Sequence, residues 1–312
     1  MRAIAVLLSL LMLSSVSGAD YETGDEAWRD IEVDMSSWDD GPELEGSPMD
    51  EPRSGDAVLV IEVEYKPSHL GSAVQGEIII ELFEEWAPTT TNNMIKNVES
   101  DIYNGIFFHR VIDDFVTQAG DPTCKAIGIY PATSATCGSG GSGETIDLEH
   151  HEKLSHVDGA IGMARGQDPD SADAQWYIAE TESHGLDPEN RDDEGYATFG
   201  IVRHGMSHIR AIALVPTSDD PTGEEIVVNP ASSAGRPIWE VHISNVEMIG
   251  VIPYAESIDK PETQSFFSTA VGKTSLGLAM IVIAVVGYAA FVRTKEDEPD
   301  AILLDFDEEI ID

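Results

Sequence analysis

The sequence predicts a mainly β domain, in which short strands close into a barrel that carries two helices. Three observations favour this fold class. Short segments rich in Val, Ile and aromatic residues recur along the chain, turn residues separate them, and only two stretches carry the signals of a helix start. A parallel α/β sheet fits less well, because so few helices are predicted.

The individual elements follow from the local sequence. Residues 58–65 and 76–82 are rich in Val and Ile and flank a run of turn residues, so we expect a pair of strands. Residues 89–100 follow a proline and begin with threonines that can cap a helix. Further strands are expected at 107–118, 176–179 and 238–248, and a short helix at 206–214.

Composition excludes several classes of protein. The 312 residues include 58 acids and 17 bases, and the net charge of −41 argues against nucleic-acid binding, which needs a basic face. A hydrophobic content of 42% is ordinary for a folded core, and two cysteines are too few for a disulfide-dense scaffold or a cysteine-based zinc ribbon. Adaptation to a salty medium and simple solubility both fit the acidity.

Two apolar segments predict export and a membrane anchor. Residues 1–19 contain one basic residue, an apolar run and small residues at the end, which is typical of a secretory signal; an uncleaved anchor is the alternative. Residues 274–292 hold no charge and are long enough to cross a bilayer once. Arg293 and Lys295 then favour a cytoplasmic C-terminus. The expected location is the cell membrane, with the main domain outside the cytoplasm.

The remaining boundaries follow from composition. Residues 20–56 hold 14 acids and two bases among Gly, Pro and Ser, and we expect an acidic disordered linker there. The globular domain is expected at 57–251, and a second linker at 252–273. Residues 293–312 form an acidic cytoplasmic tail, either simply solvated or able to bind a partner.

The most informative motif lies in the middle of the chain. Residues 107–123 read FFHRVIDDFVTQAGDPT, and this stretch resembles the signature of the cyclophilin-type peptidyl-prolyl isomerases, in which F-H-R-V-I precedes F-x-x-Q-x-G-D. Residues 159–165 (GAIGMAR) and 174–178 (AQWYI) are similar to the family blocks G-x-x-x-M-A-N and S-Q-F-F-I. Blocks similar to L-D and F-G follow in order, so the resemblance covers residues 57–248 in one collinear run.

This resemblance implies a fold and an activity. The family fold is a closed eight-stranded antiparallel barrel capped by two helices. The family reaction is rotation about an X–Pro peptide bond, whose barrier is about 20 kcal/mol because amide resonance must break. Such a reaction requires no cofactor and no metal. The implied partners are proline-containing peptides and unfolded exported proteins, and the chain is expected to be a monomer.

The resemblance also implies residue roles. Arg110 would donate toward the proline nitrogen as the bond twists, and a planar, permanently charged guanidinium suits that role better than an amine. Gln118 would bind the substrate carbonyl and hold Arg110, while Phe115 would line the proline pocket as a third catalytic residue. The other residues expected to bind substrate are Val116, Gln175, Tyr177, Leu186 and Tyr196, together with Ala164 and Arg165 through their backbone.

Four positions depart from the usual family pattern. Val116 stands where Met is common, and Arg165 stands where Asn is common, which would add a cation that favours acidic substrates. Gly185 occupies a position that is Trp or Phe in many relatives, so one wall of the pocket would be missing and cyclosporin would bind weakly. Tyr196 resembles the bacterial secreted branch of the family.

Cys124 and Cys137 bracket a loop that compact family members lack, and outside the cytoplasm a disulfide between them is plausible, with two free thiols as the alternative. The histidines lack a third ligand at a fixed spacing, so no metal site is expected; they are His150, His151, His156, His204 and His208.

The sequence therefore predicts a membrane-anchored prolyl isomerase. A non-catalytic chaperone module that binds proline peptides, and a purely structural surface protein, are the alternatives.

Overall fold

The computed structural model describes residues 26–125, 137–219 and 235–254. The chain divides into a unit that ends at Ala255 and a second unit from Glu256 to Asp312, and every described residue belongs to the first. The predicted signal, membrane span and acidic tail lie outside the described residues. Within the described ranges, no helix has the length and apolar character needed to cross a membrane.

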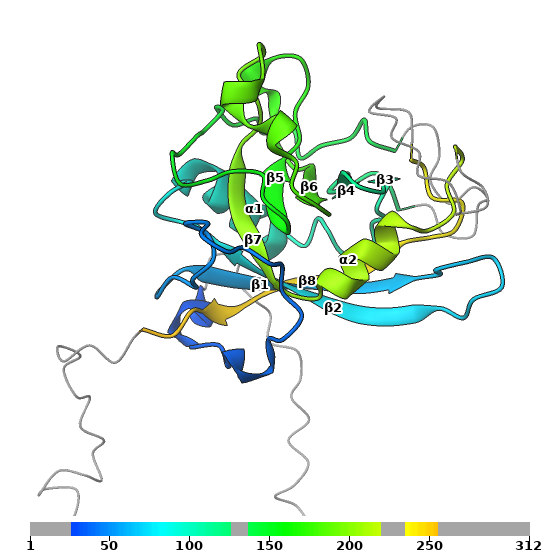
Figure 1. Ribbon diagram of the computed structural model, residues 1–312, viewed down its shortest axis with the longest axis horizontal. Coiled ribbons are helices and arrows are strands. Elements are labelled where there is room, and N and C mark those ends of the chain that lie inside the picture. Colours follow the sequence, from blue (N-terminus) through cyan, green and yellow to red (C-terminus); the bar gives the residue numbers. More distant parts are fainter. Residues whose placement is uncertain (1–25, 126–136, 220–234, 255–312) are drawn as a thin grey trace, which may run out of the picture. The chain divides into compact units, whose positions relative to one another are not determined.

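Eight strands form one antiparallel sheet that curls into a half-barrel (Figure 1). Their order across the sheet is β3-β4-β6-β5-β7-β2-β1-β8. The bounds are β1 Ala57–Tyr65, β2 Val74–Leu82, β3 Arg110–Ile112, β4 Val116–Ala119, β5 Ala160–Met163, β6 Trp176–Ala179, β7 Thr198–His204 and β8 His242–Val251.

The two ends of this strand order meet just before β3 and β8. Phe107 forms an antiparallel bridge with His242. Backbone hydrogen bonds on either side of the bridge join Phe108 N to Val241 O at 2.9 Å and Ile243 N to Ile106 O at 2.9 Å. The curvature therefore brings the short β3–β4 hairpin next to the long β1–β8 pair.

The sequence analysis missed β5 and β7. All four residues of β5 are buried, and six of the seven residues of β7 are buried, so neither strand shows an alternation of polar and apolar residues. Glycines in both strands further weaken the local signal. Their strand conformation is set by pairing with neighbouring strands: β5 pairs with β6, and β7 pairs with β2.

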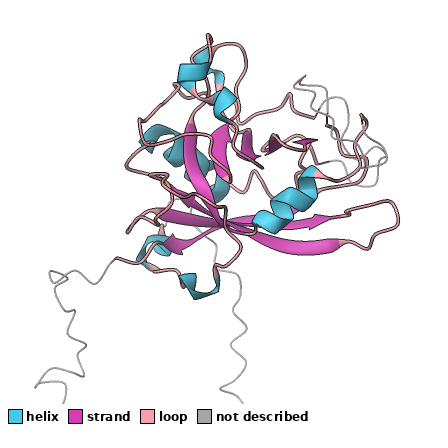
Figure 2. Cartoon of the chain, viewed as in Figure 1, coloured by secondary structure: helices cyan, strands magenta, loops and turns pink. Residues whose placement is uncertain are grey.

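Two helices accompany the sheet: α1 at Pro88–Glu99 and α2 at Met206–Ala213 (Figure 2). The expected threonine cap of α1 is wrong, because Ala87 occupies the cap position and offers no side-chain bond. Glu149 serves instead, and its carboxylate accepts from Thr89 N at 3.2 Å and Thr90 N at 2.9 Å. A carboxylate at this end also complements the helix dipole.

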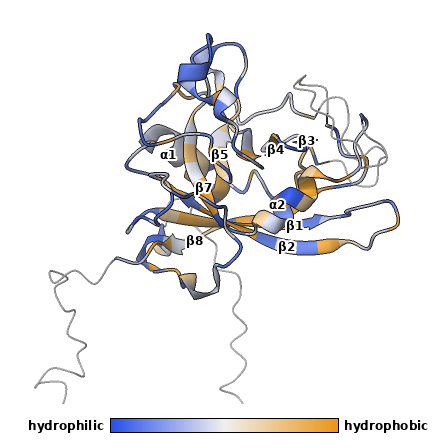
Figure 3. Ribbon diagram, viewed as in Figure 1, coloured by the Kyte–Doolittle hydropathy of each residue, from blue (hydrophilic) through white to orange (hydrophobic). Residues whose placement is uncertain are grey.

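The main core fills the space between the sheet and the helices. Trp176 lies at its centre, fully buried, and meets the rings of Phe108 and Tyr103 edge to face. In Figure 3 the hydrophobic colours lie mostly on the strands, whereas many loops are hydrophilic. The ordinary apolar content therefore builds the core, and most of the acids lie on the surface.

The expected disordered linker needs a correction. Residues 26–56, here called the N-terminal arm, pack against the domain. Val33 N donates to Val251 O at 3.0 Å, and Val251 N donates to Ile31 O at 2.8 Å, which adds a short parallel pairing to the end of β8. Trp28 is buried in the main core, and Met49 is buried against Phe83.

The arm also completes a buried ion pair between two strands. Glu81 on β2 accepts from Arg203 on β7 at 2.5 Å. The arm supplies further partners, because Arg53 N donates to Glu81 at 2.7 Å and Asp50 O accepts from Arg203 at 2.6 Å. A buried ion pair without such partners is costly, so the arm is an integral part of the domain.

Candidate functional site

The site is built on one row of cross-strand partners. Arg110 on β3 pairs with Gln118 on β4, Gln118 pairs with Tyr177 on β6, and Tyr177 pairs with Gly162 on β5. Directly opposed residues of an antiparallel sheet project their side chains to the same face. Sheet register therefore places the cation, the amide and the aromatic ring side by side.

A cavity of about 780 Å³ opens over this row. All ten residues that the sequence analysis assigns to catalysis or substrate binding line it: Arg110, Phe115, Val116, Gln118, Ala164, Arg165, Gln175, Tyr177, Leu186 and Tyr196. They come from segments spread over more than 80 residues of sequence, and the fold collects them around a single space.

One end of the cavity is apolar. Val116, Tyr177 and Leu186 form a small buried cluster that is separate from the main core, and Phe115, Ala164 and Tyr196 pack against it. The Tyr177 ring lies in a slot over Gly162, where a β-carbon would come within 2.4 Å of the ring. At Gly185, in contrast, a β-carbon would meet no atom within 4 Å.

The other end carries a chain of hydrogen bonds. Arg110 Nη1 donates to Gln118 Oε1 at 3.3 Å, and its guanidinium lies 5.8 Å from the centre of the Phe115 ring. Gln118 Nε2 donates to Gln175 Oε1 at 3.1 Å, and Gln175 Nε2 donates to Gly140 O at 2.7 Å. Burial lowers the pKa of Arg110, and Tyr196 opposes that effect. An arginine nevertheless stays charged at neutral pH.

A glycine-rich loop forms the wall beyond Gln175. Asp121 organises it, because its carboxylate accepts from Gly138 N at 2.7 Å and Gly140 N at 3.0 Å. Burial pushes the pKa of Asp121 upward, but these bonds together with those from Thr123 bring it below its ordinary value. A disulfide joins Cys124 to Cys137 at the start of this loop, as the sequence analysis expects.

Comparison with known proteins decides the family. The model of the family described as "Cyclophilin type peptidyl-prolyl cis-trans isomerase/CLD" matches residues 69–233 of the chain. The chain belongs to this family. Its cyclophilin domain extends on both sides of the matched stretch, because β1 and β8 complete the same sheet.

Proteins similar to this cyclophilin include a bacterial and a fungal isomerase. It is 37% identical over 145 residues to a peptidyl-prolyl cis-trans isomerase of Acinetobacter baylyi. The aligned stretch covers 46% of this chain and 70% of that protein. It is 34% identical over 148 residues to the isomerase ppi1 of Schizosaccharomyces pombe, which covers 47% of this chain and 86% of that protein. A cyclophilin type isomerase of Cryptosporidium parvum, a solved structure, has a TM-score of 0.44 at 21% identity and covers 62% of this chain and 97% of that one.

The role expected for the Arg165 side chain needs revision. Arg165 lines the cavity, but its side chain is only 1% exposed, and its guanidinium donates to the carbonyl oxygens of Gly195 and Gly166 at 3.0 Å each. It also lies 4.6 Å from the centre of the Tyr196 ring. This side chain therefore braces the loop rather than attracting acidic substrates. The N–H of Ala164 donates to Gln175 O at 2.8 Å, so that group is already used within the protein.

The sequence analysis missed part of the cyclophilin wall. Arg191 lines the cavity, lies 5.1 Å from the centre of the Tyr196 ring and pairs with Asp193 at 2.6 Å. Arg236, Asp173 and the loop from Gly138 to Gly141 also line the cavity. The glycines of this loop stand together in the sequence, but only the bonds to Asp121 and Gln175 show how the loop is held.

The histidines of the cyclophilin domain have structural surroundings. Burial lowers the pKa of His109 to about 4, so the ring is neutral at physiological pH and is a poor proton donor there. His156 is fully buried, and its ring nitrogens lie within hydrogen-bond distance of Asp187 and Tyr177. Among the residues that the structure describes, the one group of three possible metal-ligating side chains contains no histidine.

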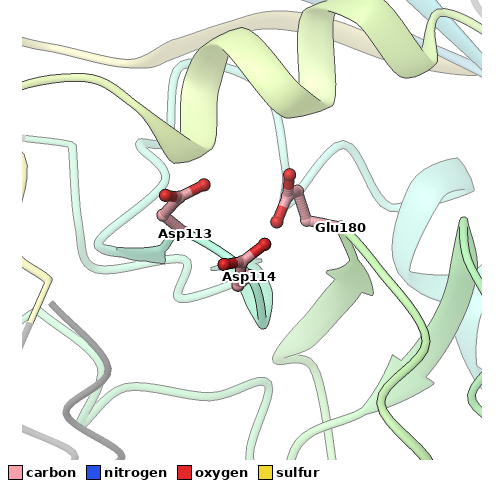
Figure 4. Close-up of side chains that lie close together, drawn as sticks. All are labelled: Asp113, Asp114 and Glu180. Atoms are coloured by element: carbon pink, nitrogen blue, oxygen red, sulfur yellow. The ribbon is translucent and has the colours of Figure 1, made fainter. Parts of the chain in front are cut away.

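Three carboxylates gather next to the cavity. One oxygen each of Asp113, Asp114 and Glu180 lie within 4.8 Å of one another, and the Asp114 and Glu180 side chains point toward each other in Figure 4. Glu180 is 8% exposed, and burial with the neighbouring charges of Asp113 and Asp114 raises its pKa to about 7. The cluster joins the turn before Phe115 to the end of β6, because Glu180 N donates to Phe115 O at 3.0 Å.

Proposed function

We propose that this chain accelerates cis–trans isomerisation of X–Pro bonds in exported proteins while anchored at the outer face of the cell membrane. One observation carries the catalytic part of the proposal: the apolar cluster of Val116, Tyr177 and Leu186 and the Arg110 guanidinium face one cavity. The cluster fits a proline ring, and the cation lies at its edge, over the Phe115 ring.

The catalytic step needs no bond to be made or broken. As the X–Pro bond twists, amide resonance is lost and the proline nitrogen gains a basic lone pair. Arg110 donates to that nitrogen, and Gln118 holds both the guanidinium and the substrate carbonyl. Because the donation is strongest in the twisted state, it lowers the barrier rather than merely tightening substrate binding. The backbone around Ala164 and the side chain of Gln175 flank the extended peptide.

The location rests on different support. Residues 1–19 and 274–292 carry the patterns of a signal and a span. The disulfide between Cys124 and Cys137 is typical of proteins outside the reducing cytoplasm. The signal pattern and the disulfide support exported proteins as the substrates. The span then leaves residues 293–312 in the cytoplasm.

The catalytic proposal is tested with the full chain in detergent, in a prolyl-isomerisation assay on short proline peptides. Arg110→Ala should lower kcat/KM by about 100-fold or more, as loss of a transition-state donor does. Arg210→Ala is the matched control, because that arginine lies on α2, pairs with Asp158 and does not line the cavity. It should leave kcat/KM unchanged.

The alternatives predict other outcomes. Binding of proline peptides without acceleration would replace the enzyme by a chaperone module that uses the same groove. Neither binding nor acceleration would leave a structural surface protein. The location is tested separately by protease treatment of intact cells: cleavage of the cyclophilin domain but not of the last 20 residues supports the proposed orientation, and full protection of the domain overturns it.

A further inference from the structure

The Tyr177 side chain is held at both ends. Its ring forms a wall of the apolar pocket, and its hydroxyl points away from the cavity into the protein, where His156 Nε2 lies 2.7 Å away. Burial raises the pKa of Tyr177 well above its ordinary value, so the hydroxyl keeps its proton and is able to donate it to that nitrogen. A phenylalanine would fill the same pocket wall without this connection.

His156 is bonded in turn to a buried carboxylate. The histidine is fully buried, and its Nδ1 lies 2.6 Å from Asp187 Oδ1. Asp187 is 2% exposed and also accepts from Ser155 Oγ at 2.5 Å and His156 N at 2.8 Å, and His184 Nδ1 lies 2.9 Å from it. Burial alone would raise the pKa of Asp187, but these hydrogen bonds hold it well below its usual range.

The three side chains therefore form a directed chain of hydrogen bonds. A charged Asp187 is an acceptor for Nδ1–H of His156, and the other ring nitrogen, Nε2, faces the Tyr177 hydroxyl. Asp187 directly follows Leu186, which is another wall of the pocket. The chain thus links two pocket walls that come from different elements, β6 and the short 3₁₀ helix His184–Leu186.

We propose that His156 and Asp187 are positioning residues for the isomerase site, which hold the Tyr177 ring and Leu186 at the spacing that a proline ring requires. This inference rests on the proposed function of the same cavity. It assigns a role to two buried polar side chains that do not line the cavity themselves. Their effect on catalysis passes through the hydroxyl of Tyr177.

The test removes the connection while keeping the pocket wall. Tyr177→Phe deletes one buried oxygen, and His156→Leu deletes its partner. In the full chain, each change should raise the Kd for a proline peptide and lower kcat/KM about fivefold, the factor that corresponds to one hydrogen bond of about 1 kcal/mol. The double variant should lose no more than the larger single loss, because both changes remove the same bond.

A matched tyrosine–histidine pair lies elsewhere in the domain and provides the control. Tyr65 Oη lies 3.1 Å from His208 Nδ1, and neither residue lines the cavity. Tyr65→Phe should lower the Tm without changing the peptide Kd or kcat/KM. If Tyr177→Phe behaves in the same way, with only the Tm affected, the chain is structural and the inference is wrong.

The outcomes separate this inference from the proposed function. A wild-type chain that neither binds nor isomerises proline peptides overturns the function. An active wild-type chain whose Tyr177→Phe variant keeps its Kd and kcat/KM overturns only the positioning role. Should His156→Leu fail to fold, Tyr177→Phe alone decides, since it leaves the histidine and the carboxylate in place.

Discussion

The peptide cavity and the N-terminal arm are stabilised in opposite ways. In the cavity, the register of neighbouring strands sets the positions of Arg110, Gln118 and Tyr177, and a continuous set of hydrogen bonds maintains them. The arm contains only two 3₁₀ helices, of four and three residues, and is held by separate anchors such as Trp28 and Met49. None of its described residues lines the cavity.

This difference predicts that the arm contributes mainly to stability and the cavity mainly to activity. Changes in the arm should lower the free energy of unfolding without altering the chemistry of the site. Changes to the cavity's polar row should reduce activity while the fold remains. Four predictions test that separation, from the largest expected effect to the smallest.

Loss of the arm's aromatic anchor should have the largest effect. Trp28 packs in the main core, and its Nε1 donates to Glu99 on α1 at 3.0 Å. Trp28→Ala should lower the free energy of unfolding by about 3 kcal/mol, as truncation of a buried aromatic side chain does, and leave kcat/KM unchanged. Denaturant unfolding measures it, with the less buried Trp38→Ala as control. If Trp28→Ala and Trp38→Ala lowered the free energy of unfolding by the same small amount, Trp28 would not anchor the arm.

Loss of the disulfide should affect both the stability of the domain and its binding of peptide. It closes a loop with a sequence separation of 13, and Cys137 leads directly into the glycine wall of the cavity. Replacement of both cysteines by serine should cost about 3 kcal/mol of unfolding free energy and also weaken peptide binding. Titration of a proline peptide against the variant checks the second effect. Unchanged binding would show that Asp121 alone maintains this wall.

A conservative change at the cation should affect activity alone. Arg110→Lys keeps the positive charge but loses the planar fork that bonds to Gln118 while donating to substrate. We expect kcat/KM to fall about tenfold, with unfolding free energy within about 0.5 kcal/mol of wild type. Isomerisation kinetics and denaturant unfolding on the same preparation measure both. Full activity with lysine would show that charge suffices.

The acidic cluster should give the smallest and most pH-dependent effect. The pKa of Glu180 is raised from 4.5 to about 7, so the folded state retains a proton that the unfolded chain loses. Stability should therefore fall as the pH rises from 4.5 to 7. Glu180→Gln should remove this loss and stabilise the domain by about 1 kcal/mol at pH 8, with no difference at pH 4.

Denaturant unfolding at the two pH values measures the Glu180→Gln effect. The opposite result, a variant that is less stable at pH 8, would mean that a cation neutralises Asp113, Asp114 and Glu180 in solution. Adding a chelator to the wild type would then reproduce the loss of stability.

Local sequence predicted those parts of the molecule whose signals are local. The strands of the first hairpin and β6 carry Val, Ile and aromatic residues in runs, and their bounds agree with expectation to within two residues. Closing strand β8 was expected at 238–248 and lies at His242–Val251, because its bounds depend on pairing with β1 rather than on composition. Buried β5 and β7 show no alternation and were missed.

The sequence by itself determined the family, the ten cavity residues and the cysteine pair, because these residue types stand in a collinear series of motifs whose chemistry can be recognised without coordinates. Tertiary structure alone decided that an acidic, irregular arm is part of the domain, that Arg165 braces a loop, and that His156 and Asp187 stand behind Tyr177. The physical reason is that a hydrogen bond or an ion pair depends on distances between atoms far apart in the chain. A motif records only which residue types are present.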